Sequence, residues 1–318
     1  MKEIGGYFEL EKLVDNEYYK NMVRLNNGRN SLIYILKSQK IKKVYLPFYL
    51  CDSVSKKVIQ EGYEVDYYNI DEKFNPIFDK KLKKDEYLYI VNFYGQINNE
   101  RLFQFKEKYK RIIIDNTHAF YQKPILDIDT IYSCRKFFGV PDGAYLYTNK
   151  KLNETLEIGD SKDRIKHLVG RLSGTASDFY NDFQKSDKEL ETEKLKCMSI
   201  FTKTILGAID YQKVKETRNI NYNILHESLK GVNKLNIEKI DGAFSYPLLL
   251  DNGETVRKKL IDKKIYISML WPNVSECVSE DSIEYKYSKN ILPIPCDQRY
   301  SSNDMNYIVD ILKGIIYK

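Results

Sequence analysis

Between residues 27 and 150, short runs of β-forming residues alternate with amphipathic stretches. This alternation is typical of a mostly parallel sheet covered by helices, because a helix usually returns the chain between parallel strands. The central runs are apolar on both faces, as buried parallel strands are. We therefore predict an α/β fold. The expected strands lie at 43–46, 64–68, 87–93, 111–115, 129–133 and 144–148, and the expected helices at 30–38, 52–61 and 99–109, the first opened by Asn30 or Ser31 and the second by Asp52.

The connection between the last two of these strands is too short for the pattern. Residues 134–143 contain Gly139, Pro141 and Gly143, and a parallel crossover needs a dozen or more residues. We therefore predict that the strand at 144–148 runs antiparallel to its neighbours.

The rest of the chain has a different pattern. Residues 160–196 are strongly charged and predict outer helices or an excursion towards a partner. Apolar spacing across 197–230 predicts one or two long amphipathic helices. A small α+β unit follows, with strands expected at 243–250 and 265–270 and helices at 253–263 and 302–316.

Composition excludes several classes of protein. The 318 residues carry a formal net charge of +6, and lysines are interspersed with acidic residues, so we expect no nucleic-acid partner. The sequence shows no membrane-spanning run and no signal peptide, and its cysteines form no C-x-x-C pair, so we expect a soluble cytoplasmic protein without a membrane partner. The three histidines lack the spacing of a helical zinc site, so no metal is expected.

Three residues are expected at the carboxyl edge of the predicted sheet, where its strands end and its helices begin. Asp115 ends an apolar strand, Lys136 follows the next strand, and Gly28 precedes the first helix. Taken singly, Asp115 also fits a helix cap and Lys136 a solvated lysine. Together they match pyridoxal 5′-phosphate (PLP), which needs a helix N-terminus for its phosphate, a carboxylate for its ring nitrogen and a lysine for its aldehyde. The Gly-rich dinucleotide motif, the P-loop and the G-x-S-x-G elbow are absent.

These residues resemble the DegT-type (DegT/DnrJ/StrS) sugar aminotransferases, PLP-dependent enzymes of the aspartate aminotransferase fold (fold type I). Residues 114–119 are similar to the family segment E-D-A-A-Q-A, and residues 133–136 resemble the S-x-x-K segment that precedes G-E-G-G. Weaker likenesses join residues 27–32 to S-G-T-x-A-L, 46–51 to V-P-x-x-T, 93–96 to H-L-Y-G-Q, and 292–295 with 304–305 to the closing segments.

The resemblance implies the architecture. It implies a mostly parallel seven-stranded sheet sandwiched by helices, with a smaller C-terminal α+β domain. The large PLP-binding domain would cover residues 1–208, including an N-terminal arm at 1–26, and the small domain residues 209–318. Because active sites in this fold lie between two subunits, the resemblance also implies a homodimer.

The resemblance also implies roles for individual residues. Lys136 would form the Schiff base with PLP and carry the proton during transfer, and Asp115 would hold the pyridinium nitrogen. His118 would lie near the phenolic oxygen of the cofactor; alternatively, it is a satisfied histidine in a turn. The other expected cofactor-binding residues are Gly28, Arg29 and Ser133 at the phosphate, Asn30 beside them, and either Tyr49 or Cys51 against the ring.

Two departures from the family pattern stand out. Arg29 replaces a small hydroxyl residue in the phosphate cradle, where it could bind the phosphate or block it. The family segment G-Y-N-x-R-M, which reaches the cofactor of the partner subunit, has no clear counterpart between 165 and 200.

The resemblance implies an aminotransferase that moves an amino group, glutamate being the expected donor, to a keto sugar attached to a nucleotide. Such a product would serve surface-polysaccharide or amino-sugar biosynthesis. Two alternatives remain. One is a PLP-dependent sugar dehydratase, against which Lys136 argues because that branch tends to carry histidine there. The other is a non-catalytic homologue that binds a nucleotide sugar or a partner protein.

Overall fold

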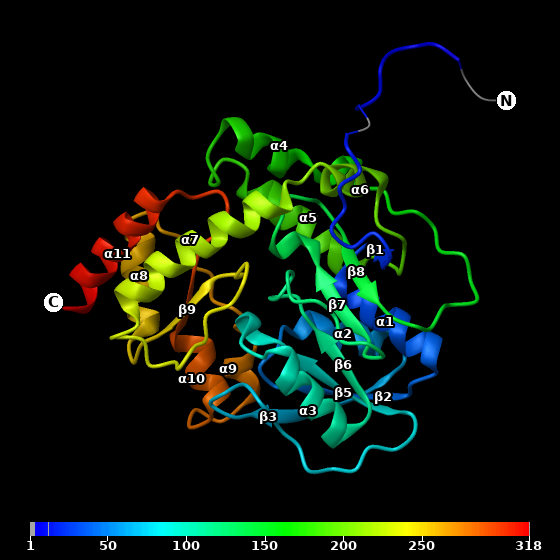
Figure 1. Ribbon diagram of the computed structural model, residues 1–318, viewed down its shortest axis with the longest axis horizontal. Helices are drawn as coiled ribbons and strands as arrows, with labels where there is room; N and C mark the ends of the chain where they lie inside the picture. Colours follow the sequence, from blue (N-terminus) through cyan, green and yellow to red (C-terminus); the bar gives the residue numbers. More distant parts are fainter. Residues whose placement is uncertain (1–3, 12, 318) are drawn as a thin grey trace.

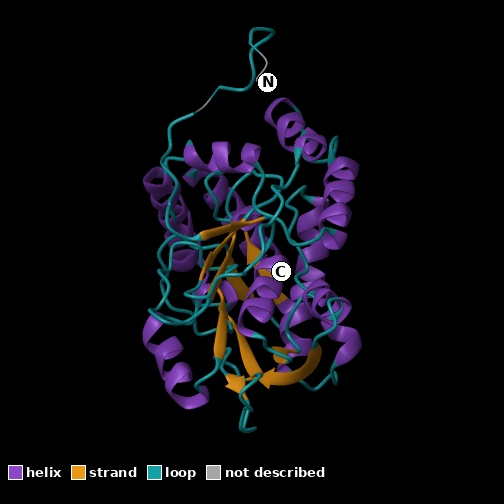
Figure 2. Cartoon of the chain, turned by 90° about the vertical axis from the view of Figure 1, so that its right-hand side faces the viewer, coloured by secondary structure: helices purple, strands orange, loops and turns teal. Residues whose placement is uncertain are grey.

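The computed structural model describes residues 4–11 and 13–317. Its main sheet has eight strands in the order β1-β8-β7-β6-β5-β2-β3-β4, and helices lie on both sides of it (Figures 1 and 2). The five inner strands β7, β6, β5, β2 and β3 are parallel. The strands are β1 (Val23–Leu25), β2 (Lys43–Pro47), β3 (Glu64–Ile70), β4 (Pro76–Ile77), β5 (Glu86–Val91), β6 (Ile112–Asp115), β7 (Thr130–Ser133) and β8 (Ala144–Tyr147).

The predicted α/β fold and the six predicted strands of this sheet are confirmed. β8 pairs antiparallel with β7, as the short connection required. The sheet has eight strands, not the seven implied by the resemblance, because two short segments join its edges. β1 pairs antiparallel with β8, and the two-residue β4 pairs antiparallel with β3. Segments this short give no period-two pattern in the sequence.

Helices α1 (Gly28–Gln39), α2 (Asp52–Gln60) and α3 (Asn99–Tyr109) connect these strands. α1 begins earlier than predicted, because its N-cap is Asn27, whose side chain accepts a hydrogen bond from the Asn30 backbone. α2 has Cys51 at its N-cap, with Asp52 in its first turn. Both helices therefore begin just beyond the carboxyl ends of strands.

The segment predicted as charged outer helices contains the short η3 (Lys162–Arg164), α4 (Lys166–Ser173) and α5 (Tyr180–Thr192). α4 buries none of its residues, whereas α5 buries Ser186 and Leu190. α6 (Ile200–Gly207) and α7 (Tyr211–Leu229) follow, as the apolar spacing predicted.

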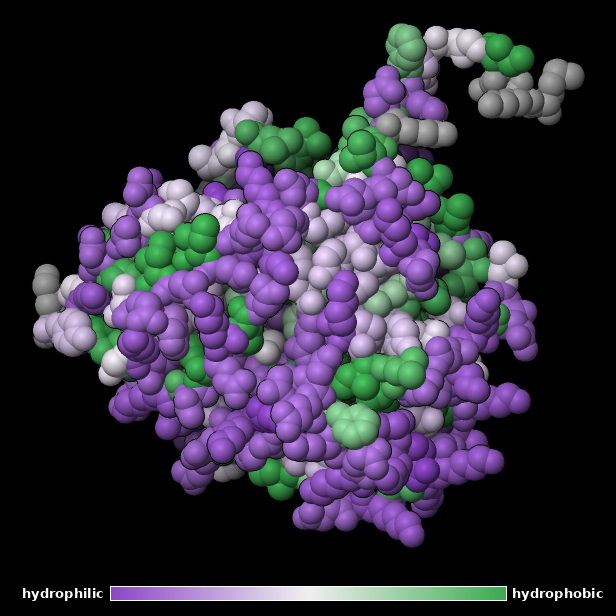
Figure 3. Space-filling view, viewed as in Figure 1, coloured by the Kyte–Doolittle hydropathy of each residue, from purple (hydrophilic) through white to green (hydrophobic). Residues whose placement is uncertain are grey.

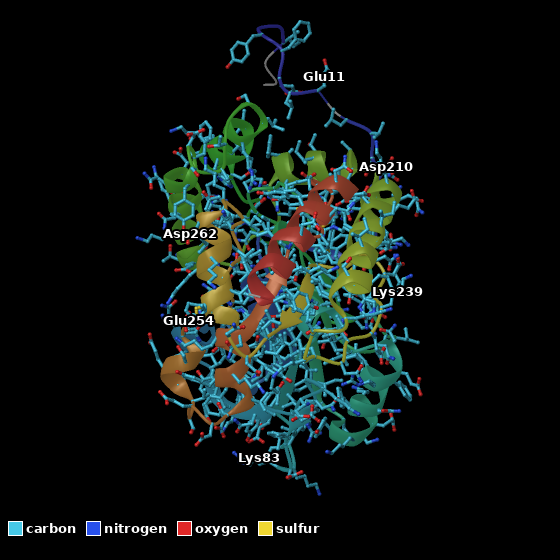
Figure 4. The ribbon with its side chains drawn as sticks, turned by 90° about the vertical axis from the view of Figure 1, so that its left-hand side faces the viewer. Glu11, Lys83, Asp210, Lys239, Glu254 and Asp262 are labelled. Atoms are coloured by element: carbon cyan, nitrogen blue, oxygen red, sulfur yellow. The ribbon has the colours of Figure 1, made fainter. Side chains whose placement is uncertain are left out.

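The C-terminal region contains α8 (Gly253–Asp262), α9 (Val274–Cys277), α10 (Ile283–Asn290), α11 (Ser302–Ile316) and an antiparallel pair formed by β9 (Tyr246–Leu249) and β10 (Ile291–Ile294). Figure 4 shows α11 lying between α7 and α8. The strand predicted at 265–270 is wrong. Ile265 and Ile267 are buried there and pack into the hydrophobic cluster beneath α11, but without a partner strand, so burial alone produced their alternation. The predicted division at residue 208 stays a prediction.

The first described residues of the N-terminal arm, 4–11, extend away from the rest of the molecule and expose apolar side chains (Figure 3). Ile4, Tyr7 and Phe8 are each at least 96% exposed. Among the described residues, no helix combines the length with the apolar character that a bilayer crossing requires.

Candidate active site

The carboxyl edge of the parallel strands brings the predicted residues together. Asp115 is the last residue of β6, and Lys136 ends the short helix η2 (Cys134–Lys136) directly after β7. A Cβ atom on Gly28 would lie 3.9 Å from Thr117 Oγ1 and 3.7 Å from Ile131 Cγ2. The N-terminus of α1 therefore lies against the ends of β6 and β7, where ligands bind in open α/β sheets.

Asp115 is a buried carboxylate with two fixed hydrogen-bond donors. The Tyr89 hydroxyl donates to Oδ2 at 2.7 Å, and the Thr117 backbone N–H donates to Oδ1 at 2.8 Å. Burial raises the pKa of Asp115, although these donors and the charge of Lys136 act in the opposite direction. A carboxylate desolvated to this degree is stabilised by a nearby cation, and a protonated ring nitrogen is such a partner.

The side chain of Lys136 is exposed to solvent, although the surrounding protein still desolvates its amine. Burial is the main cause that lowers the pKa of Lys136, and repulsion from Arg135 adds to it. The positive charge of Lys136 acts on both Asp115 and His118, so the three groups share one site. An amine with a lowered pKa is more often neutral near pH 7 and is then a nucleophile towards an aldehyde.

The backbone next to Lys136 is held by α7 and by the C-terminal region. Arg218 of α7, 1% exposed, donates to the Phe137 carbonyl at 3.1 Å, and Gln298 Nε2 donates to the same carbonyl at 2.8 Å. Arg218 also donates to the Ala243 carbonyl at 2.7 Å. These bonds fix the segment that carries Lys136 to residues far along the chain.

Replacing Arg218 with leucine is expected to lower the free energy of unfolding by roughly 3 kcal/mol, because buried carbonyls lose charged donors. Urea unfolding followed by circular dichroism measures the change. Arg171→Leu on the exposed face of α4 serves as the control. Equal stability of the two variants would contradict this account of Arg218.

His118 lies between two aromatic rings contributed by the C-terminal region. Its imidazole stacks on Phe244, with ring centroids 4.2 Å apart and planes 5° apart, and Trp271 lies parallel to it at 5.7 Å. Its Nδ1 accepts the Tyr94 backbone N–H at 3.4 Å, so Nε2 carries the proton in the neutral ring. Burial, with a contribution from Lys136, lowers the pKa of His118 to about 3.

A histidine kept neutral by burial makes stability depend on pH. The unfolded chain binds a proton near pH 6.5 and the folded chain does not, so stability is lost as pH falls below 6.5 towards 3. We expect wild type to lose about 2–3 kcal/mol more than His118→Gln between pH 6 and pH 4, at about 1.4 kcal/mol per pH unit. Urea titrations at both pH values test this, with His226→Gln as the control. Parallel pH dependences of wild type and His118→Gln would contradict it.

The first turn of α1 has unused capacity for an anion. Asn27 is 7% exposed, and its Nδ2 is buried without a hydrogen-bond partner among the described residues. Arg29 donates to two neutral acceptors, Ser53 Oγ at 3.1 Å and the Leu190 carbonyl at 3.1 Å. Burial lowers the pKa of Arg29. An orphaned donor, a guanidinium bonded to neutral acceptors and a helix N-terminus fit a phosphate group.

The remaining predicted residues lie around this site in different ways. Asn30 is fully buried, and its Nδ2 is engaged with Asn26 and with the Glu193 and Lys194 carbonyls. Ser133 ends β7 and is partly exposed. The binding roles of both stay predictions.

The two residues considered for ring stacking occupy different surroundings. Cys51 Sγ lies 3.1 Å from Ser53 Oγ. Cys51 also contributes to raising the pKa of both Lys136 and Arg29, against the larger effect of burial. Tyr49 is fully buried, with its hydroxyl 3.3 Å from the Tyr94 hydroxyl and its ring edge-on to Trp271 at 4.6 Å. The ring-stacking role of both residues stays a prediction.

The sequence did not reveal Tyr89, Asn27, Phe244 or Trp271. For Tyr89 a signal existed, because Val91 pairs with Asp115 and Tyr89 lies two residues earlier, on the same face of the sheet. No local pattern could have placed Phe244 or Trp271 on His118, because they are far along the chain.

No protein-family model and no curated protein matches the sequence. Solved structures do match. A DegT/DnrJ/EryC1/StrS aminotransferase from Brucella abortus aligns with a TM-score of 0.63 at 14% identity, covering 93% of this chain and 86% of that one. A sugar aminotransferase from Micromonospora echinospora gives 0.63 at 13% identity, covering 92% and 87%. NtdA from Bacillus subtilis, solved with bound pyridoxamine phosphate (PMP), gives 0.66 at 12% identity, covering 93% and 73%. The chain therefore has the fold of the DegT-type sugar aminotransferases, which is PLP fold type I.

Proposed function

We propose that this protein is a PLP-dependent sugar aminotransferase. The observation that carries the proposal is the meeting, at one sheet edge, of a nucleophilic lysine, a buried carboxylate and an anion-binding helix N-terminus. Lys136, Asp115 and the first turn of α1 supply them. The structural neighbours include proteins solved in PLP and PMP forms, which supports the same cofactor here.

Each residue has a defined task in this proposal. When bound, PLP supplies an electron sink for the carbon that gains or loses the amino group. Lys136 Nζ would hold the cofactor through its aldehyde and would carry a proton to and from the substrate carbon. Asp115 keeps a proton on the ring nitrogen through its carboxylate.

The remaining tasks are binding and orientation. His118 stays neutral and offers its Nε2 proton to an oxygen of the cofactor, while Phe244 and Trp271 hold the plane of the imidazole. Gly28 and Arg29 bind the phosphate at the N-terminus of α1, where the Asn27 amide supplies a further donor.

The finer parts of the proposal concern substrates and surroundings. We assign glutamate as the donor, a nucleotide-linked keto sugar as the acceptor, and amino-sugar or surface-polysaccharide biosynthesis as the pathway. We further propose a cytoplasmic homodimer. All five cysteines are free thiols, which fits a reducing compartment. The apolar side chains on the N-terminal arm and on α4, where Leu172 is 88% exposed, fit burial against a second copy.

A half-reaction experiment tests this function. Purified protein is loaded with PLP, freed of excess and mixed with glutamate, and the visible absorption of bound PLP should give way to that of PMP. A keto sugar that restores the PLP absorption is the acceptor. Uptake of PLP without a response to any amino donor would favour the non-catalytic homologue, and no uptake would overturn the proposal.

A further inference from the structure

Helix α5 packs against the site from the outside, through two contacts to the cations beside Lys136. Asp187 Oδ1 accepts a hydrogen bond from Arg135 Nη1 at 3.0 Å, and the Leu190 carbonyl accepts one from Arg29. The C-terminal end of α5 is fastened to the same region, because the Glu193 carbonyl accepts bonds from Asn30 Nδ2 and Lys57 Nζ. The helix is therefore a wall of the site.

Three cations converge beneath this wall. Arg135 contributes to lowering the pKa of Arg29, and both arginines contribute to lowering the pKa of Lys136. Like charges that are close enough to lower each other's pKa repel one another, and a bound anion stabilises such a cluster of cations. Arg29 gives two hydrogen bonds to neutral acceptors, and Asp187 occupies a single nitrogen of Arg135. A guanidinium has five N–H donors, so Arg135 keeps several free.

A buried hydroxyl on the face of α5 that carries Leu190 provides an observation independent of the charges. Ser186 is 3% exposed, and its Oγ has no hydrogen-bond partner among the described residues. It lies one turn before Leu190, the other buried residue of α5. The inward face of α5 thus presents an unpaired polar atom beside the residue whose carbonyl contacts Arg29.

We propose that Arg135 is a second phosphate-binding guanidinium for the cofactor, and that Asp187 of α5 is the positioning residue that holds Arg135 beside Arg29 and the N-terminus of α1. The inference rests on the proposed function, because the phosphate is that of PLP. It assigns to the divergent segment 160–196 a role within its own chain. The 48% exposure of Asp187 keeps its charge partly solvated, so the carboxylate orients Arg135 without cancelling the attraction for a dianion.

The test compares PLP with pyridoxal, which lacks the phosphate. Binding of each to the apoprotein is measured by absorbance for wild type, Asp187→Ala, Arg135→Met and the matched control Asp182→Ala. Asp182 lies on the same helix and accepts its bond at 3.0 Å from Lys166 of α4, which is not one of the cations of the proposed site. We expect Asp187→Ala to weaken PLP about tenfold and Arg135→Met by about thirtyfold or more, with pyridoxal changed less than about twofold.

The outcomes separate the two proposals. Equal weakening of PLP and pyridoxal in Asp187→Ala would indicate general loosening and overturn the inference, as would an unchanged affinity or an equal loss in Asp182→Ala. In each of these cases wild type still takes up PLP, and the proposed function stands. Wild type that binds neither ligand overturns the proposed function itself. Circular dichroism melting confirms that each variant is folded.

Discussion

Replacing Lys136 with alanine is expected to lower aminotransferase activity by at least about 10³-fold, because the nucleophile and the proton carrier are one amine. The residual affinity for PLP should be carried by the phosphate cradle and Asp115, so noncovalent uptake persists. The bound cofactor should then resemble free PLP in its absorption and should dissociate during gel filtration. Activity assays with glutamate and absorbance spectra before and after filtration measure both effects.

The control for this variant is Lys151→Ala, an exposed lysine after β8. It should match wild type in spectrum and activity. The free energy of unfolding gives a second check. It should change little in Lys136→Ala, because the variant removes a desolvated amine that Arg135 repels. A Lys136→Ala protein that keeps more than a tenth of wild-type activity would contradict the assignment.

The second large effect is expected at Asp115. Asp115→Asn keeps the shape of the side chain, and its one oxygen can still accept the Thr117 backbone N–H while its amide group donates to the Tyr89 hydroxyl, but it loses the negative charge. Without that charge the ring nitrogen is not held protonated, so activity should fall by roughly 10²–10³-fold while PLP still binds to Lys136. Asp115→Ala should in addition weaken PLP binding.

A matched control exists for the carboxylate. Burial also raises the pKa of Asp129, which precedes β7 and so lies at the opposite edge of the sheet. Asp129→Asn should leave activity and PLP affinity close to wild type. Comparable losses of activity in Asp115→Asn and Asp129→Asn would show that neutralising any buried carboxylate lowers activity, and would contradict a specific role for Asp115.

The sequence predicted the fold well where its signals are local. Runs that are apolar on both faces, around Leu88 and Ile113, indicated central strands. The short connection at 134–143 correctly predicted the antiparallel direction of β8. The expected start of α1 at residue 30 was off because a cap depends on side-chain geometry, as Asn27 shows, whereas α2, α3, α8 and α11 begin where predicted. The segment at 265–270 was wrong because Ile265 and Ile267 are buried by packing and not by pairing.

Only the site residues that follow directly from neighbouring strands could be predicted from the sequence. Asp115 and Lys136 follow strands that are neighbours, so their positions could be inferred from strand order. Phe244 and Trp271 of the C-terminal region and Arg218 of α7 reach the site through long-range packing, which no local pattern records. The contact between Asp187 and Arg135 similarly depends on how α5 docks, and the sequence showed only that its segment is charged.

Covalent mapping of the cofactor tests the central claim most directly. The protein is loaded with PLP, reduced with borohydride, digested and sequenced by mass spectrometry. We expect one modified lysine, Lys136, and no such modification in Lys136→Ala. Modification at another lysine in wild type, or a reduced protein without any bound pyridoxyl group, would contradict it.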